Sequence, residues 1–235
     1  MPSESVIVER RDAVSIIHVD DGRANAMTFE VMAAIRQAVV DADADPDVGA
    51  VVLHGRPGRF SAGFDLSVVQ GGDPQAVRNL VSDGGDLTHL MYGCGVPVVA
   101  ACTGHAIAMG ALLLLACDVR IGADTESKVG LSEVAIGMAL PGWAITLAVE
   151  RLSRRHLQRA VANARLTTPA EAVNVGFLDE VVPADDVLDR AVAVAADLAT
   201  TLHPKAYAIT VVSLRGRMLA LMAAQSNEFR TAGKF

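Results

Sequence analysis

The sequence has few aromatic residues and few cysteines, and both absences restrict the fold. Phe, Trp and Tyr together make up 4% of its 235 residues, whereas Ala, Val and Leu are abundant. Because β-sandwiches usually draw on aromatic strands, this composition favours layered α/β packing. Cys94, Cys102 and Cys117 are odd in number and lack the paired spacing of metal ligands. We therefore expect reduced, buried thiols in a cytoplasmic protein.

Other signals are missing as well. The net charge is −7 and the pI about 5.3, which disfavours nucleic acid and anionic membranes as partners. Residues 1–12 have no basic region followed by an apolar one, so we expect no signal peptide. Residues 96–119 are apolar, but Pro97 and Gly104 interrupt them, which favours a buried strand, turn and helix over a membrane span. The histidines lack metal-ligand spacing and no phosphate-binding glycine loop follows a strand, so we expect no metal and no bound nucleotide cofactor.

The local patterns predict strands alternating with capped helices. Thr28, Asp73 and Thr168 each precede a helical pattern, and Thr168 forms a capping box with Glu171. Pro follows both Asp73 and Thr168, as is favoured at the first position of a helix. A turn is expected at residues 103–105.

The second half of the chain changes character. Residues 106–117 predict a helix without a polar face, which must be buried. From Asp185 onward the pattern is helical only. We therefore predict an α/β core with a parallel sheet over residues 1–184 and a C-terminal helical region over 185–235.

Four stretches resemble, in this order, the crotonase superfamily, which is the enoyl-CoA hydratase/isomerase family. They are FSAGFDL at 60–66 and the segments 103–124, 129–143 and 166–183. The resemblance implies the ClpP/crotonase fold, a repeated ββα spiral core with a C-terminal helical layer. It also implies an acyl-coenzyme A thioester as substrate, no permanently bound cofactor, and a homotrimer or dimer of trimers. The C-terminal region would then support assembly and part of the CoA site.

The same resemblance assigns an oxyanion hole. An enolate formed from a thioester needs donors where negative charge develops on the carbonyl oxygen. The family pattern implies the backbone N–H groups of Phe64 and Met109. Relatives usually have glycine at the position of Met109, so we expect its side chain to need room beside the thioester. The CoA contacts implied by the resemblance are Arg23, Ala24, Ala62, Asp65 and Leu66.

The carboxylates suggest which reaction is catalysed. Hydratases of this family use two glutamates, whose positions match Leu112 and Glu133 here. Leucine cannot orient water, and the pattern is closest to the Δ3,Δ2-enoyl-CoA isomerases, which move a proton with one glutamate. We expect desolvation by the apolar residues around Glu133 to raise its pKa toward neutrality; these are Val129, Leu131, Val134, Ile136 and Met138. The resemblance further implies an acyl pocket formed by Leu112, Met138, Leu140 and Trp143.

Alternatives remain open at this point. The chain could be a hydratase, could catalyse another enolate reaction such as thioester hydrolysis, or could bind acyl-CoA without turnover. The stretch 104–114 also resembles Clp-type serine peptidases, but Ala108 stands at the nucleophile position and excludes an acyl-enzyme there. Structural roles compete at several positions: Asp65 could cap a short helix, Trp143 could be plain core, and Asp118 and Arg120 could form an ion pair.

Overall fold

The computed structural model describes residues 5–232. Its main sheet has six strands in the order β1-β2-β4-β7-β9-β11. The hairpin β1–β2 is antiparallel, and the other neighbours are parallel. The strands are β1 (Val6–Arg11), β2 (Val14–Val19), β4 (Ala50–Gly55), β7 (Val98–Cys102), β9 (Val119–Ala123) and β11 (Glu180–Val182).

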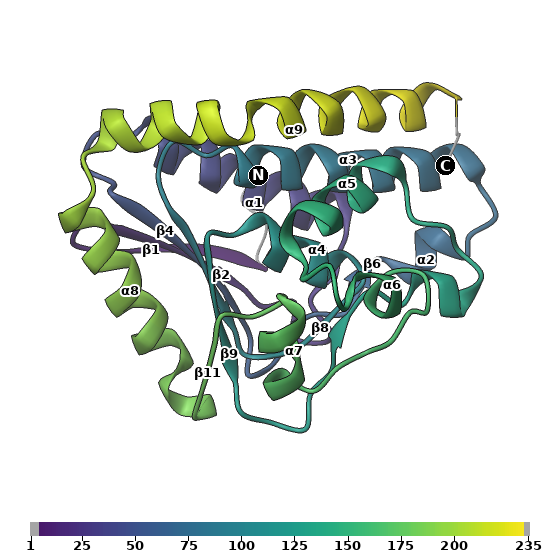
Figure 1. The fold of residues 1–235 in the computed structure, drawn as a ribbon, viewed down its shortest axis with the longest axis horizontal. Helices are drawn as coiled ribbons and strands as arrows, with labels where there is room; N and C mark the ends of the chain where they lie inside the picture. The colour runs from purple at the N-terminus through teal and green to yellow at the C-terminus, as the bar shows by residue number, and fades with distance from the viewer. Residues whose placement is uncertain (1–4, 233–235) are drawn as a thin grey trace.

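Helices cover both faces of this sheet, which explains the continuous apolar runs in its strands. Alternate residues of one strand enter different cores: Val51 faces the main core, whereas Val52 packs toward α8 (Val187–Thr201). On the main-core side lie α1 (Phe29–Ala44), which Thr28 caps as predicted, and α4 (Met109–Ala116). Figure 1 shows α8 flanking the sheet at the left of the molecule.

Two smaller sheets complete the strand layer. One contains β10 (Val129–Gly130), β8 (Gly104–Ile107) and β5 (Gly58–Ser61), all parallel. The other pairs β3 (Ala26–Met27) with β6 (Gly63–Phe64). The turn predicted at 103–105 is therefore wrong, and the helix predicted from residue 106 begins at Met109. Pairing with β5 and β10 holds Gly104–Ile107 extended, and such long-range contacts override local preference.

The helix α4 is the most enclosed element of the fold. All eight of its residues are buried, as the absence of a polar face predicts. It packs against α5 (Gly142–Arg151), which is followed in the chain by α6 (Leu157–Ala160) and α7 (Pro169–Val175). The predicted capping box of Thr168 and Glu171 is present at the start of α7.

A further layer of helices packs on α4 and α5. There α3 (Pro74–Tyr92) packs along α9 (Pro204–Ala232), which also contacts α5. Figure 1 shows α9 running along the top of the molecule beside α3. The C-terminal helical layer is thus as predicted. The division at residue 184 stays a prediction, and the chain ends, 1–4 and 233–235, lie outside the described residues.

Within residues 5–232, α9 is the one helix that is long and apolar enough to cross a membrane by length and composition alone. A single such helix is weak evidence for a span. Its buried residues recur on one face, namely Val211, Arg215, Met222, Ser226 and Phe229, and that face packs on the protein. The apolar segment 96–119 forms β7, β8 and α4 instead, which agrees with the predicted strand and helix.

A buried ion pair ties α9 to the sheet. Arg215 donates to Asp118 at 2.6 Å and to the Tyr92 carbonyl at 2.9 Å. The two charged side chains are 10% and 14% exposed. An ion pair between Asp118 and Arg120 is therefore wrong, because Arg120 pairs with Asp179 at 2.6 Å. Each of the two residues is held by a segment distant in sequence.

We expect Arg215→Met to lower the free energy of unfolding by about 3 kcal/mol, since it leaves the Asp118 carboxylate buried without its cation. Urea unfolding measures this. Arg217→Met, at an exposed position on the same helix, is the control and should stay within about 0.5 kcal/mol of the wild type. Equal losses in both variants would contradict the structural role of this pair.

Candidate active site

The three-stranded sheet brings the predicted site residues to one edge. Its strands are parallel, with Ser61 beside Ala106 and Ile107 beside Gly130, and the register of β5 against β8 shifts between Arg59 and Ser61. Chain segments that leave parallel strands at their carboxyl ends emerge on the same side. The segments leaving here carry Phe64, Met109 and Glu133, so strand pairing gathers residues that lie up to 69 positions apart in the sequence.

The loop after β5 is fixed by buried polar contacts. Ser61 Oγ donates to the Asn25 carbonyl at 2.8 Å and accepts from the Gly63 N–H at 3.1 Å. Asn25 is fully buried with φ 52°, and its Nδ2 donates to the Val19 carbonyl at 2.7 Å. Sequence reasoning missed Asn25 and Ser61, although a polar residue between apolar strands is the signal that could have found them.

The N–H of Phe64 is directed away from β3. The next N–H, that of Asp65, donates to the Met27 carbonyl of β3 at 3.3 Å. Neighbouring N–H groups in an extended segment point in opposite directions, so the Phe64 N–H faces the other side. Gly63, at φ 100°, lies against the start of α4, because a Cβ on it would stand 3.5 Å from Met109 N. The two predicted donors therefore come from touching backbone segments.

The start of α4 offers unpaired N–H groups. The N-cap residue Ala108 makes no side-chain hydrogen bond to the helix, and its φ and ψ are 51° and −118°. The first N–H groups of any helix lack intrahelical partners and carry partial positive charge. Met109 is the first residue of this helix, so its N–H can stabilise a developing oxyanion.

The side chain of Met109 packs toward α3, and its place relative to a thioester stays a prediction. The side chain is fully buried, and its sulfur packs against Gly84 of α3. A Cβ built on this glycine would be 3.0 Å from the sulfur. The same Cβ would be 2.6 Å from the ring of Phe64, so both side chains pack against this glycine. The next residue, Gly85, makes similar room for the indole of Trp143. The paired glycines in α3 are thus site-shaping residues that sequence reasoning missed.

Glu133 begins the short 3-10 helix η1 (Glu133–Ile136) and is 7% exposed. Its Oε2 is buried without a hydrogen-bond partner among the described residues. Burial raises its pKa to about 7, while backbone hydrogen bonds at Glu133 and Ser132 oppose the shift. The expected shift is therefore present. Of the apolar residues named for it, Val129 and Leu131 are fully buried, whereas Val134 and Ile136 are 44% and 60% exposed.

The predicted CoA contacts lie together. The Ala62 N–H donates to the Ala24 carbonyl at 3.0 Å, and both alanines precede the β3–β6 pair. Arg23, Ala62 and Leu66 are exposed. Asp65 accepts from the Ser67 N–H and so caps α2 (Leu66–Val69), which is the structural role considered above.

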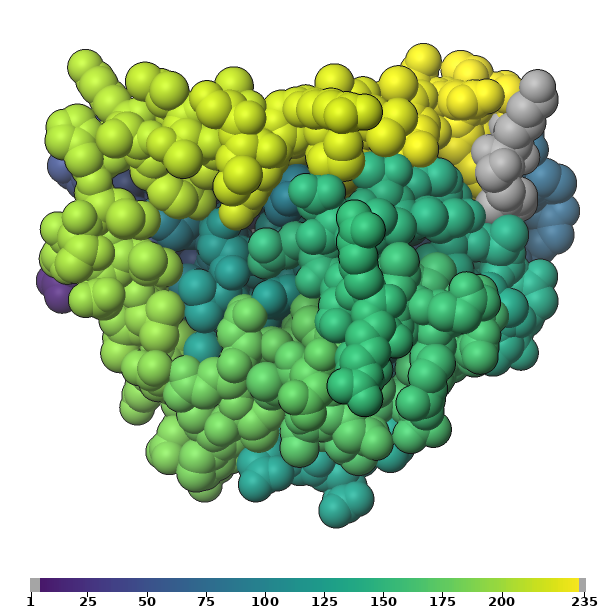
Figure 2. Space-filling model, in the orientation of Figure 1, coloured from purple at the N-terminus to yellow at the C-terminus, as the bar shows by residue number. Residues whose placement is uncertain are grey.

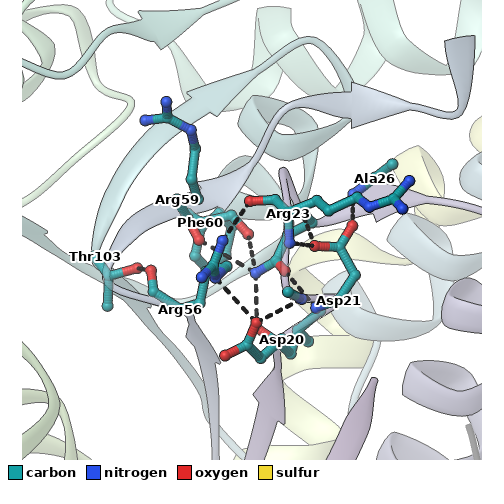
Figure 3. A network of polar contacts seen from close by, with 11 residues as sticks. Asp20, Asp21, Arg23, Ala26, Arg56, Arg59, Phe60 and Thr103 are labelled. Carbon is teal, nitrogen blue, oxygen red and sulfur yellow. Dashed lines mark hydrogen bonds and ion pairs between the residues drawn. The ribbon is translucent and has the colours of Figure 1, made fainter. Parts of the chain in front are cut away.

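An ionic network supports the segment that contains Arg23. Arg56 forms an ion pair with Asp20 at 2.9 Å and donates to the Arg23 carbonyl at 2.6 Å. Asp21 accepts from the Arg23 N–H at 2.7 Å. Figure 3 shows the guanidinium groups of Arg23 and Arg59 extending out of this network. Both cations therefore remain available to an anionic ligand such as a phosphate group.

The residues predicted to line an acyl pocket are mostly core residues in this structure. Leu112, Leu140 and Trp143 are 1%, 5% and 0% exposed and belong to the main core, whereas Met138 is half-buried. The indole N–H of Trp143 is buried without a partner among the described residues. A wall for an acyl chain at these residues stays a prediction.

Known proteins share this fold and sequence. A family model described as enoyl-CoA hydratase/isomerase matches residues 9–227. Mouse mitochondrial enoyl-CoA delta isomerase 1 is 31% identical over 193 residues, which cover 80% of this chain and 67% of the mouse protein. A solved enoyl-CoA hydratase/isomerase family protein from Pseudomonas syringae is 34% identical, with a TM-score of 0.94 and 99% of each chain covered. The enoyl-CoA hydratase EchA3 from Mycobacterium ulcerans is 33% identical, with a TM-score of 0.92 over 98% of this chain and 100% of that chain.

These relatives include one named isomerase and one named hydratase. Likeness alone therefore does not choose between the two reactions. The predicted crotonase fold is confirmed by the solved structures. The family match spans most of the chain, and the strands, helical layer and clustered loops agree with it. This protein therefore belongs to the enoyl-CoA hydratase/isomerase family.

Proposed function

We propose that this enzyme of acyl-CoA metabolism converts 3-enoyl-CoA to 2-enoyl-CoA with Glu133 as its single base. The proposal rests on one observation, which is that the candidate site contains a single buried carboxylate. Within residues 5–232, Glu133 is the one buried acidic residue without a cationic partner, whereas Asp118 pairs with Arg215. Leu112, fully buried, stands where hydratases of the family carry their other glutamate. Water addition needs groups to orient and deprotonate water, whereas moving a proton needs one base.

The proposed reaction relocates one proton. Glu133 takes a proton from C2 of the 3-enoyl thioester, and the electron pair spreads over the dienolate to the thioester oxygen. The N–H groups of Phe64 and Met109 stabilise that oxygen, each contributing about 3 kcal/mol. The protonated Glu133 then returns the proton at C4, which leaves the double bond between C2 and C3. No atom is gained or lost, so no water enters the balance.

The raised pKa suits this double task. A carboxyl with a pKa of about 7 is a stronger base than an exposed glutamate, and its acid form also exists near neutral pH. The unpaired Oε2 leaves one oxygen free to receive the proton. Burial thus supplies both the basicity and the vacant acceptor.

The CoA part would lie over Arg23, Ala24, Ala62 and Leu66, with backbone groups contacting the adenine and pantetheine. The free Arg23 guanidinium offers charge for a phosphate. We also propose that the protein works in the cytoplasm without a permanently bound cofactor.

We further propose that copies of the chain assemble into a homotrimer or a dimer of trimers through α9. Large apolar side chains are exposed on this helix, and Figure 2 shows the helix as a yellow band at the surface. They are Ile209, Val212, Leu214 and Leu221. Large apolar side chains exposed along one helix favour protein association.

The substrates separate the candidate reactions. We expect the purified protein to convert 3-enoyl-CoA and to leave 2-enoyl-CoA unhydrated, as followed by chromatography of the thioesters. Glu133→Gln should lower kcat about 1,000-fold, because an amide cannot accept the proton. Glu126→Gln, at an exposed position, is the matched control and should keep full activity. Efficient hydration of 2-enoyl-CoA would favour a hydratase, and tight binding without turnover a non-catalytic homologue.

Isomerisation should depend on pH through Glu133. The base must be ionised, so kcat/KM should rise as pH increases through about 7 and level off above it. A rate profile measured between pH 5 and 9 tests this. A flat profile would show that Glu133 is not the base.

The raised pKa of Glu133 can also be tested without catalysis, through the stability of the protein. The folded pKa of Glu133 lies above the ordinary 4.5, so the folded state binds more protons between these values. The stability that the neutral carboxyl contributes is complete below pH 4.5 and is lost as pH rises through 7. Glu133→Gln stays neutral and should therefore become more stable than the wild type by about 3 kcal/mol at pH 8.

Assembly is testable by light scattering. The wild type should have a mass of three or six chains, and Leu214→Glu should shift it toward one chain because a charge cannot be buried unpaired. Ser213→Glu, also exposed on α9 but not apolar, is the control. A monomeric wild type would contradict the proposal.

A further inference from the structure

We propose that Ala108 is a positioning residue whose strained backbone and methyl group together aim the N–H of Met109. The proposal rests on the proposed function, because it takes that N–H to be an oxyanion donor. Ala108 itself would touch no reacting atom. It lies between β8 and α4, at the point where the chain turns from strand to helix.

The backbone of Ala108 is in a region that alanine rarely adopts. Its φ of 51° and ψ of −118° match the first central residue of a type II′ turn, which glycine dominates. Among the described residues, the other non-glycine residues with positive φ are Asp12, Asn25 and Ala164. Asn and Asp tolerate positive φ, so the two alanines are the uncommon cases.

The surrounding structure holds this conformation from both sides. The Ala108 N–H donates to the Gly130 carbonyl of β10 at 3.0 Å, and the Ala108 carbonyl accepts from Leu112 N–H at 3.1 Å. One bond anchors the residue to the three-stranded sheet and the other to the buried helix. Such strain persists only where neighbouring contacts enforce it, and it concentrates at functional sites.

The methyl group explains why glycine, which would relieve the strain, is absent. A Cβ built on Gly63 would stand 3.0 Å from the Ala108 Cβ. The methyl of Ala108 therefore faces the Gly63 backbone and separates the two segments that carry Phe64 and Met109. A glycine at 108 would relax the backbone and remove this spacer at the same time.

A strained residue between a strand and a helix has a known catalytic role in another enzyme fold. In α/β-hydrolases a strained residue between strand and helix carries the nucleophile, and the N–H of the following residue helps to form the oxyanion hole. Ala108 has no hydroxyl, so the turn here cannot serve a nucleophile. The remaining use of the strained turn is to direct the amide that follows it, which is that of Met109.

The test compares two alanine-to-glycine variants with the wild type. Ala108→Gly should raise Tm and lower kcat at least tenfold, while KM changes little. Ala164→Gly removes a similar positive φ from the turn after α6 and should raise Tm with kcat unchanged. A lower Tm for Ala108→Gly, or an unchanged kcat, overturns the proposal.

A spectroscopic reading separates this proposal from the proposed reaction. A conjugated dienoyl-CoA absorbs at longer wavelength when its thioester oxygen accepts hydrogen bonds, and binding alone suffices. The wild type and Ala164→Gly should shift the absorbance equally, and Ala108→Gly should shift it less. An equal shift in all three contradicts only the role of Ala108. A wild type that binds without any shift contradicts the oxyanion hole itself, whether or not 3-enoyl-CoA is converted.

Discussion

Parallel pairing of three short strands is the constraint on which the rest of this site depends. The strand β8 lies between β5 and β10, and each of the three continues into a segment with a candidate functional group. Register fixes the distance of each group from the sheet edge. Because β8 also leads directly into the buried helix α4, the packing of that helix fixes where the Met109 N–H lies. A different register between β10 and β8 would move Glu133 relative to Met109, and a different register between β5 and β8 would move Phe64.

The site contains two features that lower the stability of the protein, and favourable packing elsewhere in the fold offsets their free energy. Glu133 is buried with an unpaired oxygen, and Ala108 has a strained backbone. Each feature destabilises the protein by an amount on the order of 1–3 kcal/mol. The all-apolar α4, the two-sided burial of the sheet and the Arg215–Asp118 pair hold these features in place. Strain and desolvation thus lie where the proposed chemistry needs a fixed donor and a strong base.

Several features were predictable because they depend on neighbours in the sequence. Thr28, Asp73 and Thr168 start helices by capping N–H groups a few residues away, and all three caps are present. The buried position of α4 followed from its lack of polar residues. Contacts between residues far apart in the sequence were harder to predict. The strand at Gly104–Ile107 depends on partners about 45 and 23 residues away. The ion pairs of Asp118 and Arg120 depend on α9 and on Asp179.

By itself the sequence determined the α/β class, the family and the identity of the single candidate base, since these follow from residue types and their order. Only the tertiary structure decided what surrounds that base. Of the apolar residues near Glu133 in the sequence, Val129 and Leu131 are buried whereas Val134 and Ile136 are exposed. Only the packing of the segment decides which of them share the buried surroundings that raise the pKa of Glu133. The room for Phe64, Met109 and Trp143 likewise comes from Gly84 and Gly85 on a separate helix. Burial and close approach are properties of assembled segments, which is why the printed order of residues could not specify them.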